Sequence, residues 1–343
     1  MMDQGAMGKW RSVRMFIIAA TICLPATANA QKTIKAALAL PQNATGTNFI
    51  NRTYEFFKSD LEARPNGSLK VELIYGGALG SAVDRMNMMR HGAIKMSDAS
   101  DGNYATIYPD IQVLNIPYLF STEQNAWRVL DGPIGQEIAE DIRIKTGIRV
   151  LGWWSSGGFR HFSANRPLRR PADFAGLKIR ALGPPSIPFI EALRAEPVPI
   201  AFGELYTALA TGLVEIQENS LSVFRLVRLQ EVHKFILLSG HSYPVNVLAI
   251  NNAFYTRLSN DERAAVDTAA TKAIAFNREE SRKDEEDATA ALRSAGIEFI
   301  ELTPEQKDEF RTITQGPMIE WLKTEIKAPS LIDRLLSEAR AAK

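Results

Sequence analysis

Strand-like and helix-like patterns of apolar residues alternate along the first half of this 343-residue chain. The segments "TIKAALAL" (33–40) and "LKVELIYGG" (69–77) have the composition and spacing of buried strands, and "IRVLGWW" (148–154) repeats that pattern. Between the first two segments, residues 48–63 carry apolar side chains at the spacing of one helical face. Alternation of this kind predicts parallel strands that are covered by helices on both faces.

The pattern restarts after residues 153–158, which suggests two α/β halves that meet there. A short helix is predicted at Pro171–Phe174, among strand patterns at 158–165, 177–182, 197–200 and 213–219. We predict an α/β fold of two domains, each a mostly parallel sheet flanked by helices, with the chain crossing near residues 155 and 241. The predicted boundaries are 31–155 plus 242–280 for domain I and 156–241 plus 281–343 for domain II.

The last third of the chain predicts one long helix, at about 259–294. Ser259 and Glu262 have the spacing of a capping box, and neither proline nor glycine occurs from there to Ser294. At 1.5 Å per residue such a helix is about 50 Å long, which exceeds the width of a small domain. We therefore expect it to lie across both domains.

The first 30 residues have the features of a signal peptide. Lys9, Arg11 and Arg14 precede the apolar stretch "MFIIAATICLPA", and Ala28-Asn29-Ala30 is a small-residue cleavage site. We predict cleavage after Ala30 and export to the periplasm; the alternative is an uncleaved membrane anchor. No later stretch approaches the about 18 consecutive apolar residues of a membrane span, so the exported chain is not expected to be embedded in the membrane.

Charge and composition remove several classes of function. After loss of the signal peptide, 37 basic residues face 38 acidic ones, a balance that argues against nucleic acid as a partner. The single cysteine, Cys23, leaves with the signal peptide, which excludes disulfides, thiol catalysis and cysteine-ligated zinc. Motifs for nucleotide binding, zinc hydrolysis and serine hydrolysis are missing from the sequence. We assign no catalytic residue, no metal ligand and no cofactor.

Two arginines at predicted strand ends are better candidates for chemistry. Arg180 lies in "AGLKIRALGPP", where a short alternating strand runs into a Gly-Pro-Pro turn, and Arg160 lies in "GGFRHFSANRPL". Open α/β sheets bind ligands at the carboxyl ends of their strands, and a guanidinium can hold a carboxylate by two parallel hydrogen bonds. A surface or interdomain salt bridge is the alternative for each arginine, and for Arg160 this means a pair with an acid of the opposite domain.

The segment "AEPVPIAFGELYTALATGLVEIQENS" (195–220), which follows "FAGLKIR", resembles the DctP-type solute-binding proteins of tripartite ATP-independent periplasmic (TRAP) transporters. Weaker similarity extends over nearly the whole mature chain, through "LIYGGALGSAVDRMNMMRHGAI", "IPYLF" and "GFRHFSANRPL". Glu215-Ile216 and Ser220 depart from the family pattern, and Ser100 stands about where members that bind a large acidic sugar have a glutamate. These departures leave the identity of the ligand open.

The resemblance implies a two-domain periplasmic clamp that closes on an organic acid. It would deliver the acid to a sodium-driven membrane permease made of a small and a large subunit. By the same resemblance Arg180 pairs with the ligand carboxylate, Arg160 is a second anion contact, and Phe202 and Asn219 line the cleft. The physical chemistry agrees, because only a preplaced charged fork offsets the desolvation of a carboxylate in a closing cleft.

Further candidates face the cleft by their predicted positions. Trp154 lies at the domain crossing, with hinge packing as its alternative, and Tyr243 follows the second crossing. Asp84, Ser100 and Asn103 fall on loops that are expected to face the cleft from domain I. Two competing functions are a sensory binding protein that serves a receptor and an exported enzyme on the same scaffold. The sequence leaves open which acid is bound, whether a metal bridges it, and whether the protein is a monomer or a dimer.

Overall fold

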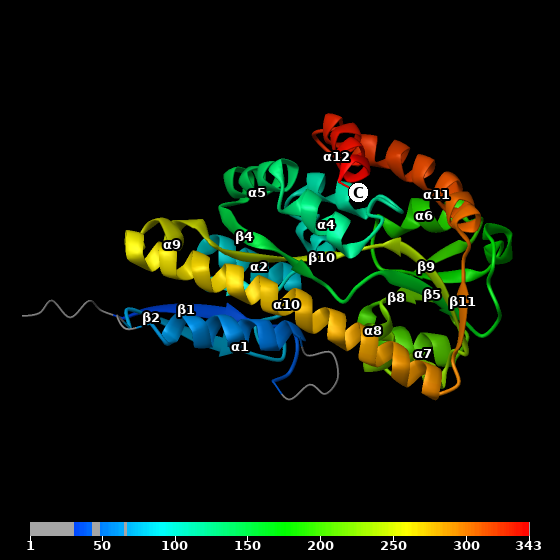
Figure 1. Cartoon of the computed structure of the whole chain (residues 1–343), viewed down its shortest axis with the longest axis horizontal. Coiled ribbons are helices and arrows are strands. Elements are labelled where there is room, and N and C mark those ends of the chain that lie inside the picture. The colour runs from blue at the N-terminus through cyan, green and yellow to red at the C-terminus, as the bar shows by residue number, and fades with distance from the viewer. Residues whose placement is uncertain (1–30, 43–48, 65–66, 343) are drawn as a thin grey trace, which may run out of the picture. The chain divides into compact units, whose positions relative to one another are not determined.

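The computed structural model describes residues 31–42, 49–64 and 67–342, which form two β-sheets with helices on both faces of each (Figure 1). This confirms the predicted fold class. The predicted signal peptide, residues 1–30, lies outside the described residues. In the described part of the chain, no helix is both long enough and apolar enough to cross a membrane.

The first sheet has five strands. In spatial order they are β2 (Leu69–Ile74), β1 (Lys32–Ala37), β3 (Met96–Ser97), β10 (Val245–Asn251) and β4 (Ile148–Ser155). The three strands β2, β1 and β3 are parallel, whereas β10 is antiparallel to both of its neighbours. The sheet is therefore mixed rather than mostly parallel, because the chain enters it through β10 on its return from β9 of the second sheet.

The second sheet has six strands. In spatial order they are β11 (Glu298–Glu301), β9 (Phe235–Ser242), β5 (Arg160–Ala164), β8 (Ile216–Asn219), β6 (Lys178–Ala181) and β7 (Glu196–Pro199). Its outer pairs are parallel, and β5 is antiparallel to β8 and β9. The predicted strands at 158–165, 177–182, 197–200 and 213–219 are thus present.

Helices complete both layers. The helices are α1 (Phe49–Glu62), α2 (Ala82–His91), α3 (Asp101–Tyr104), α4 (Glu123–Leu130), α5 (Pro133–Thr146), α6 (Ser186–Ala192), α7 (Leu205–Ala210), α8 (Leu221–Leu226), α9 (Asn252–Thr256), α10 (Asn260–Ser294), α11 (Pro304–Glu325) and α12 (Ser330–Ala341). Short 3₁₀ turns are η1 (Pro109–Asn115), η2 (Pro171–Phe174), η3 (Phe202–Glu204) and η4 (Leu229–Glu231). The helix predicted at 171–174 is therefore a 3₁₀ turn.

Each sheet separates two apolar clusters, as the alternation of side chains along β10 shows. Val245, Val247 and Ala249 pack with α4, α5 and α12 on one face, whereas Leu248 and Ile250 pack with α1 and α10 on the other. The second sheet is covered by α6 and α11 on one face, and by α7, α8 and the end of α10 on the other. Burial on both faces explains the nearly continuous apolar runs in the sequence.

The chain passes from the first sheet to the second between β4 and β5, and it returns between β9 and β10. At the first crossing Gly157 has a φ of +118°, and a Cβ there would lie 2.9 Å from Ser220 Oγ. Only glycine combines this backbone conformation with such a close approach. The crossing therefore lies tightly against the start of α8.

The long helix α10 confirms the prediction for residues 259–294. Ser259 is its N-cap, and the capping box with Glu262 is present. The helix contacts α1 and β4 of the first sheet and α8 beside the second sheet, so it passes along both (Figure 1). Asn277 accepts a hydrogen bond from the Ser155 amide at 2.8 Å, and Glu285 accepts two from the amides that start α8.

Replacing Ser259 by alanine is expected to lower the free energy of unfolding by about 1 kcal/mol, because it removes the N-cap acceptor of α10. Urea denaturation of residues 31–343 measures this loss. Ser294→Ala, at the other end of the same helix, is the control and should change stability by less than about 0.5 kcal/mol. Equal losses in the two variants would contradict the assigned capping role.

The C-terminal helices divide their contacts between the two sheets. Phe310 of α11 packs beneath the second sheet, whereas Met318 and Leu322 of α11 and Leu335 of α12 belong to the apolar cluster of the first sheet. Part of the range 281–343, which we assigned to domain II, therefore packs with the other half. The packing follows from the apolar stripe of α12, which meets α4.

Candidate functional site

Four strands of the second sheet bring polar side chains to one edge. Strands β6 and β8 are parallel, with Ile179 opposite Ile216, so Arg180 and Asn219 lie near carboxyl ends on the same edge. Strand β5 is antiparallel to β8, with His161 opposite Asn219. Arg160 therefore begins its strand rather than ending it, and the antiparallel pairing still brings it to this edge.

Arg180 is held at this edge in an unusual state. Its side chain is buried, with 1% of the residue exposed, and its Nε donates a hydrogen bond to the Ile200 carbonyl at 3.1 Å. Its Nη1 and Nη2 have no hydrogen-bond acceptor within the described ranges. Burial lowers the pKa of Arg180 to about 10, and the charge of Arg160 adds to this effect while Glu218 opposes it. A buried guanidinium with two unused donors is costly unless an anion engages it.

Arg160 is already paired within its own sheet. Its Nε and Nη2 donate to the two carboxylate oxygens of Glu218, the second at 2.8 Å, and His241 Nε2 lies 3.4 Å from Glu218 Oε2. Glu218 keeps a pKa of about 2, because Arg160 and the hydrogen bond from His241 outweigh its burial. Burial lowers the pKa of His241, which is therefore neutral at pH 7. Arg160 thus forms a salt bridge, but its partner is on the neighbouring strand of the same sheet and not in the opposite domain, as the alternative for Arg160 required.

The Phe202 ring is partly exposed, whereas the Asn219 side chain is buried and held by a hydrogen bond. The Phe202 ring is 45% exposed and its centre lies 6.0 Å from the Arg180 guanidinium carbon, so it is not part of the core. Asn219 is buried, and its Nδ2 donates to Gln217 Oε1 at 2.6 Å. Gln217 in turn donates to Ser163 Oγ. Hydrogen bonding therefore fixes the orientation of the Asn219 side chain.

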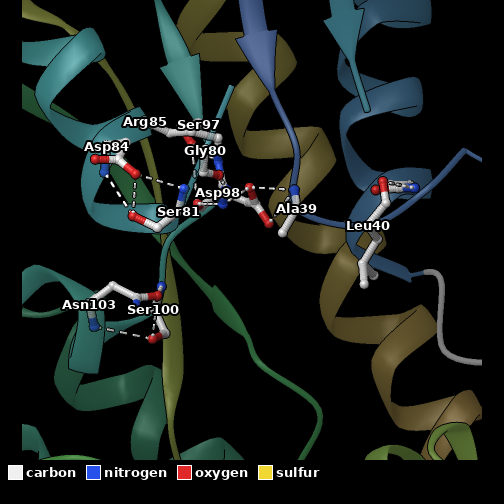
Figure 2. A network of polar contacts seen from close by, with 11 residues as sticks. Ala39, Leu40, Gly80, Ser81, Asp84, Arg85, Ser97, Asp98, Ser100 and Asn103 are labelled. Carbon is white, nitrogen blue, oxygen red and sulfur yellow. Dashed lines mark hydrogen bonds and ion pairs between the residues drawn. The ribbon is translucent and has the colours of Figure 1, made fainter. Parts of the chain in front are cut away.

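A buried ion pair organises the opposing edge of the first sheet (Figure 2). Asp98 follows β3, and its Oδ1 lies 3.0 Å from Arg85 Nη2. The same carboxylate accepts the Ala39 amide, which follows β1, and Arg85 Nη1 donates to the Gly80 carbonyl, which follows β2. The pair thus ties together the loops after three parallel strands.

Three predicted contacts on this edge take part in helix caps (Figure 2). Asp84 is exposed and accepts hydrogen bonds from the Ser81 amide and hydroxyl at the start of α2. Ser100 and Asn103 form the capping box of α3. Of the three, Ser100 lines the cavity described next, whereas Asp84 and Asn103 do not.

A cavity of about 160 Å³ lies between residues of the two sheets. Its lining includes Arg160, Glu218 and His241 from the second sheet, and Ser100 and Asp101 from the first half of the chain. Asn115, at the end of η1, also lines it. Glu218, His241, Asp101 and Asn115 were not singled out from the sequence. Glu218 lies inside the segment 195–220 discussed above, but alternation along a strand does not reveal a side chain's partner.

The structure places the two aromatic candidates elsewhere. Trp154 is fully buried in the core of the first sheet, where it packs edge-on against Tyr54. Tyr243 lines a separate cavity of about 690 Å³ and packs against Trp127 and Phe159. The two cavities share no lining residue. The position of the Trp154 side chain follows from alternation along the strand, because Trp153 and Trp154 necessarily face opposite sides of the sheet.

The arrangement suits anion binding better than catalysis. Both oxygens of Glu218 are engaged by Arg160, so this acid is not free to accept a proton from a substrate. Over the described ranges, no group of three or more His, Cys, Asp or Glu side chains is placed to hold a metal. The chemistry left at this edge is a buried, unpaired guanidinium beside an aromatic ring. The polar cavity is lined by Arg160 and Glu218 of the same edge, and its lining does not include Arg180, Phe202 or Asn219.

Comparison with known proteins gives a consistent result. The sequence model of the DctP family, described as bacterial extracellular solute-binding protein, family 7, matches residues 42–323. The 2,3-diketo-L-gulonate-binding periplasmic protein of Escherichia coli is 31% identical over 245 residues, which are 71% of this chain and 74% of that protein.

Solved structures of TRAP periplasmic solute-binding proteins are similar throughout. One from Ochrobactrum anthropi, with its C-terminus bound in the ligand-binding pocket, gives a TM-score of 0.84 at 30% identity and covers 91% of this chain and 96% of its own. The sugar acid binding protein of Advenella mimigardefordensis, in complex with galactonate, gives a TM-score of 0.81 at 28% identity and covers 92% and 99%.

Proposed function

We propose that Arg180 captures an organic acid by its carboxylate. The chain belongs to the family 7 bacterial extracellular solute-binding proteins. The observation that carries this proposal is the buried Arg180 guanidinium, whose Nη1 and Nη2 have no acceptor within the described part of the chain. A carboxylate presents two acceptor oxygens in the geometry that a guanidinium fork matches. Lysine could not replace it, because an ammonium offers no such fork.

The neighbouring residues fit this role. Arg160 is already neutralised by Glu218, so Arg180 supplies the net positive charge of the edge. Phe202 offers an exposed aromatic wall beside it, and a cation–π contact stabilises the guanidinium where water is excluded. Arg160 then acts on the ligand mainly by closing the cavity, rather than as the second charged anchor that the resemblance implied.

The wider role follows from the family. Its members include proteins that bind 2,3-diketo-L-gulonate and galactonate, both of which are organic acids. We propose that this chain works in the periplasm after cleavage behind Ala30, and that it hands its acid to a TRAP permease of one small and one large membrane subunit. We assign it no catalytic activity, because its family consists of solute-binding proteins and because Glu218, one of the acids that line the cavity, is held by Arg160.

A thermal-shift screen of residues 31–343 tests the carboxylate anchor. The protein is first unfolded and refolded to remove copurified ligand, and it is then mixed with organic acids and with the amide or ester of each. At one hundred times its Kd a ligand adds about 2.7 kcal/mol, which raises the Tm by several degrees. We expect a shift with an acid and none with its ester. A screen in which esters shift the Tm as much as acids would overturn the proposal.

A further inference from the structure

Two polar side chains that line the 160 Å³ cavity each keep one atom without a hydrogen-bond partner. Asp101, at the start of α3, is 3% exposed, and its Oδ1 accepts the Gly102 amide at 2.8 Å. Its Oδ2 has no partner within the described ranges. Asn115 is half-buried, and its Nδ2 likewise has no acceptor there. The two residues that carry this unused acceptor and this unused donor thus line the same small cavity.

The local fold accounts for only part of the Asp101 carboxylate: the Gly102 amide donates to Oδ1, and the Gly102 and Val245 amides both lower the pKa of the group. Helix α3 has four residues, and its start is capped by Ser100 and Asn103 rather than by Asp101. The nearest charges that act on Asp101 belong to the ligand-binding edge, where Arg160 opposes the burial that raises its pKa. Buried polar atoms without partners are rare in native proteins, and they call for an explanation.

The two unused atoms discriminate among ligand groups by hydrogen-bond chemistry. A hydroxyl donates one hydrogen bond and accepts others, so it can satisfy Asp101 and Asn115 together. A carboxylate only accepts, which leaves Asp101 unpaired, and an ammonium only donates, which leaves Asn115 unpaired. A buried partner left unpaired costs binding free energy, and this is how a site rejects a close analogue.

The charges around the cavity point the same way. Arg160 and Glu218 neutralise each other, and burial keeps His241 neutral at pH 7. Asp101 is therefore the one acidic side chain lining the cavity that lacks a cationic partner within the described ranges. A second ligand carboxylate placed there would meet an uncompensated negative charge, which is strongly unfavourable in a buried site.

We propose that Asp101 and Asn115 form a hydroxyl-selective subsite, so that this chain binds hydroxy monocarboxylates in preference to dicarboxylates of the same length. The inference rests on the proposed function, in which Arg180 holds the ligand's carboxylate. Asp101 then determines specificity at the other end of the ligand. The cavity volume limits this end to a few heavy atoms, such as a terminal hydroxymethyl group.

Matched acids that exchange one terminal group test the subsite by calorimetry. The pairs are glycerate and tartronate, threonate and tartrate, and gluconate and glucarate, in each of which a CH₂OH becomes a carboxylate. At pH 7.5 we expect the hydroxy monocarboxylate of the best-binding pair to bind about 100-fold more tightly than its partner. In Asp101→Asn the ratio should fall at least about tenfold, because the like charge is removed while the shape is kept.

Acidification gives a second readout that a merely structural role would not change. Burial raises the pKa of Asp101 to about 6, and the Gly102 amide and the charge of Arg160 oppose this rise. Glu218, whose pKa is about 2, and the neutral His241 also line the cavity. Asp101 is thus charged at pH 7.5 and mostly neutral at pH 5. The preference for the monocarboxylate should shrink on going from pH 7.5 to pH 5 in the wild type and stay constant in Asp101→Asn.

The controls separate this inference from the proposed function. Asp287→Asn, an exposed change on α10, should leave the ratio unaltered. Comparison of 4-hydroxybutanoate with 4-aminobutanoate tests for an ammonium, and tighter binding of the amino acid would overturn the hydroxyl assignment. Equal ratios in the wild type and Asp101→Asn would also overturn it, while acid binding through Arg180 would stand. If no acid of any pair binds although the screen finds another acid, the hydroxyl assignment is overturned and the carboxylate anchor stands; if no acid binds in the screen either, the proposed function fails first.

Discussion

Replacing Arg180 by methionine is expected to weaken acid binding by about two to four orders of magnitude and to leave the unliganded protein at least as stable as the wild type. The loss of affinity follows from removing one partner of a buried charge pair, which costs about 3–5 kcal/mol. Methionine keeps an unbranched side chain in the same space but carries no charge. Calorimetry with the acid found by the screen measures the first effect, and thermal unfolding without ligand measures the second.

The two effects have opposite signs for one physical reason. In the unliganded protein burial lowers the pKa of Arg180 to about 10, which corresponds to a cost of roughly 3 kcal/mol for the charged form. The hydrogen bond to the Ile200 carbonyl, the Phe202 ring and the charge of Glu218 offset only part of this cost. The unliganded site therefore lowers the free energy of unfolding, and ligand binding restores it, as is common at binding sites.

An exposed arginine of the same half serves as the control. Arg169 is 60% exposed and lies 3.9 Å from Glu298, a surface pair of the kind that contributes about 0–1 kcal/mol. Arg169→Met should change neither affinity nor Tm appreciably. If Arg180→Met bound the acid as tightly as the wild type, the anchor would have to lie elsewhere. If it lost binding only by unfolding, the guanidinium would be structural.

Much of this arrangement was predictable from the sequence because it depends on local patterns. Alternation and turn residues located the strand that carries Arg180, and a capping box with an uninterrupted run located the helix from Asn260 to Ser294. Since strands of an α/β sheet place their ends on shared edges, Arg180 and Asn219 could be expected on one edge. These features need only the few residues around each position.

Partners far apart in the chain were not predictable in this way. Glu218 neutralises Arg160 across 58 positions, and this pairing exists because β5 and β8 are antiparallel neighbours. The alternation of side chains did not predict which face of the sheet Trp154 points to, and the structure places it in the core. Asp101 and Asn115 belong to short helical turns without periodicity, so only the tertiary fold shows that they line one cavity.

The second large effect is expected at the buried pair of Arg85 and Asp98. Arg85→Met or Asp98→Asn should each lower the free energy of unfolding by about 3–5 kcal/mol, because either change leaves a buried polar or charged partner unmatched. Burial outweighs Arg85 in setting the pKa of Asp98, which is raised. Desolvation therefore costs more than the pairing returns. The double variant should accordingly lose much less than the sum of the two single variants.

A double-mutant cycle by urea denaturation measures this coupling, with Arg334 and Glu137 as the exposed control pair. The control side chains are both 52% exposed, so its coupling should stay below about 1 kcal/mol. Additive losses at Arg85 and Asp98 would contradict the assigned pairing. Because this pair joins the loops that contain Ala39 and Gly80, each single variant should also weaken acid binding without touching Arg180. The double variant should recover stability more fully than affinity, since the uncharged pair restores burial but not the hydrogen bond that Arg85 makes to the Gly80 carbonyl.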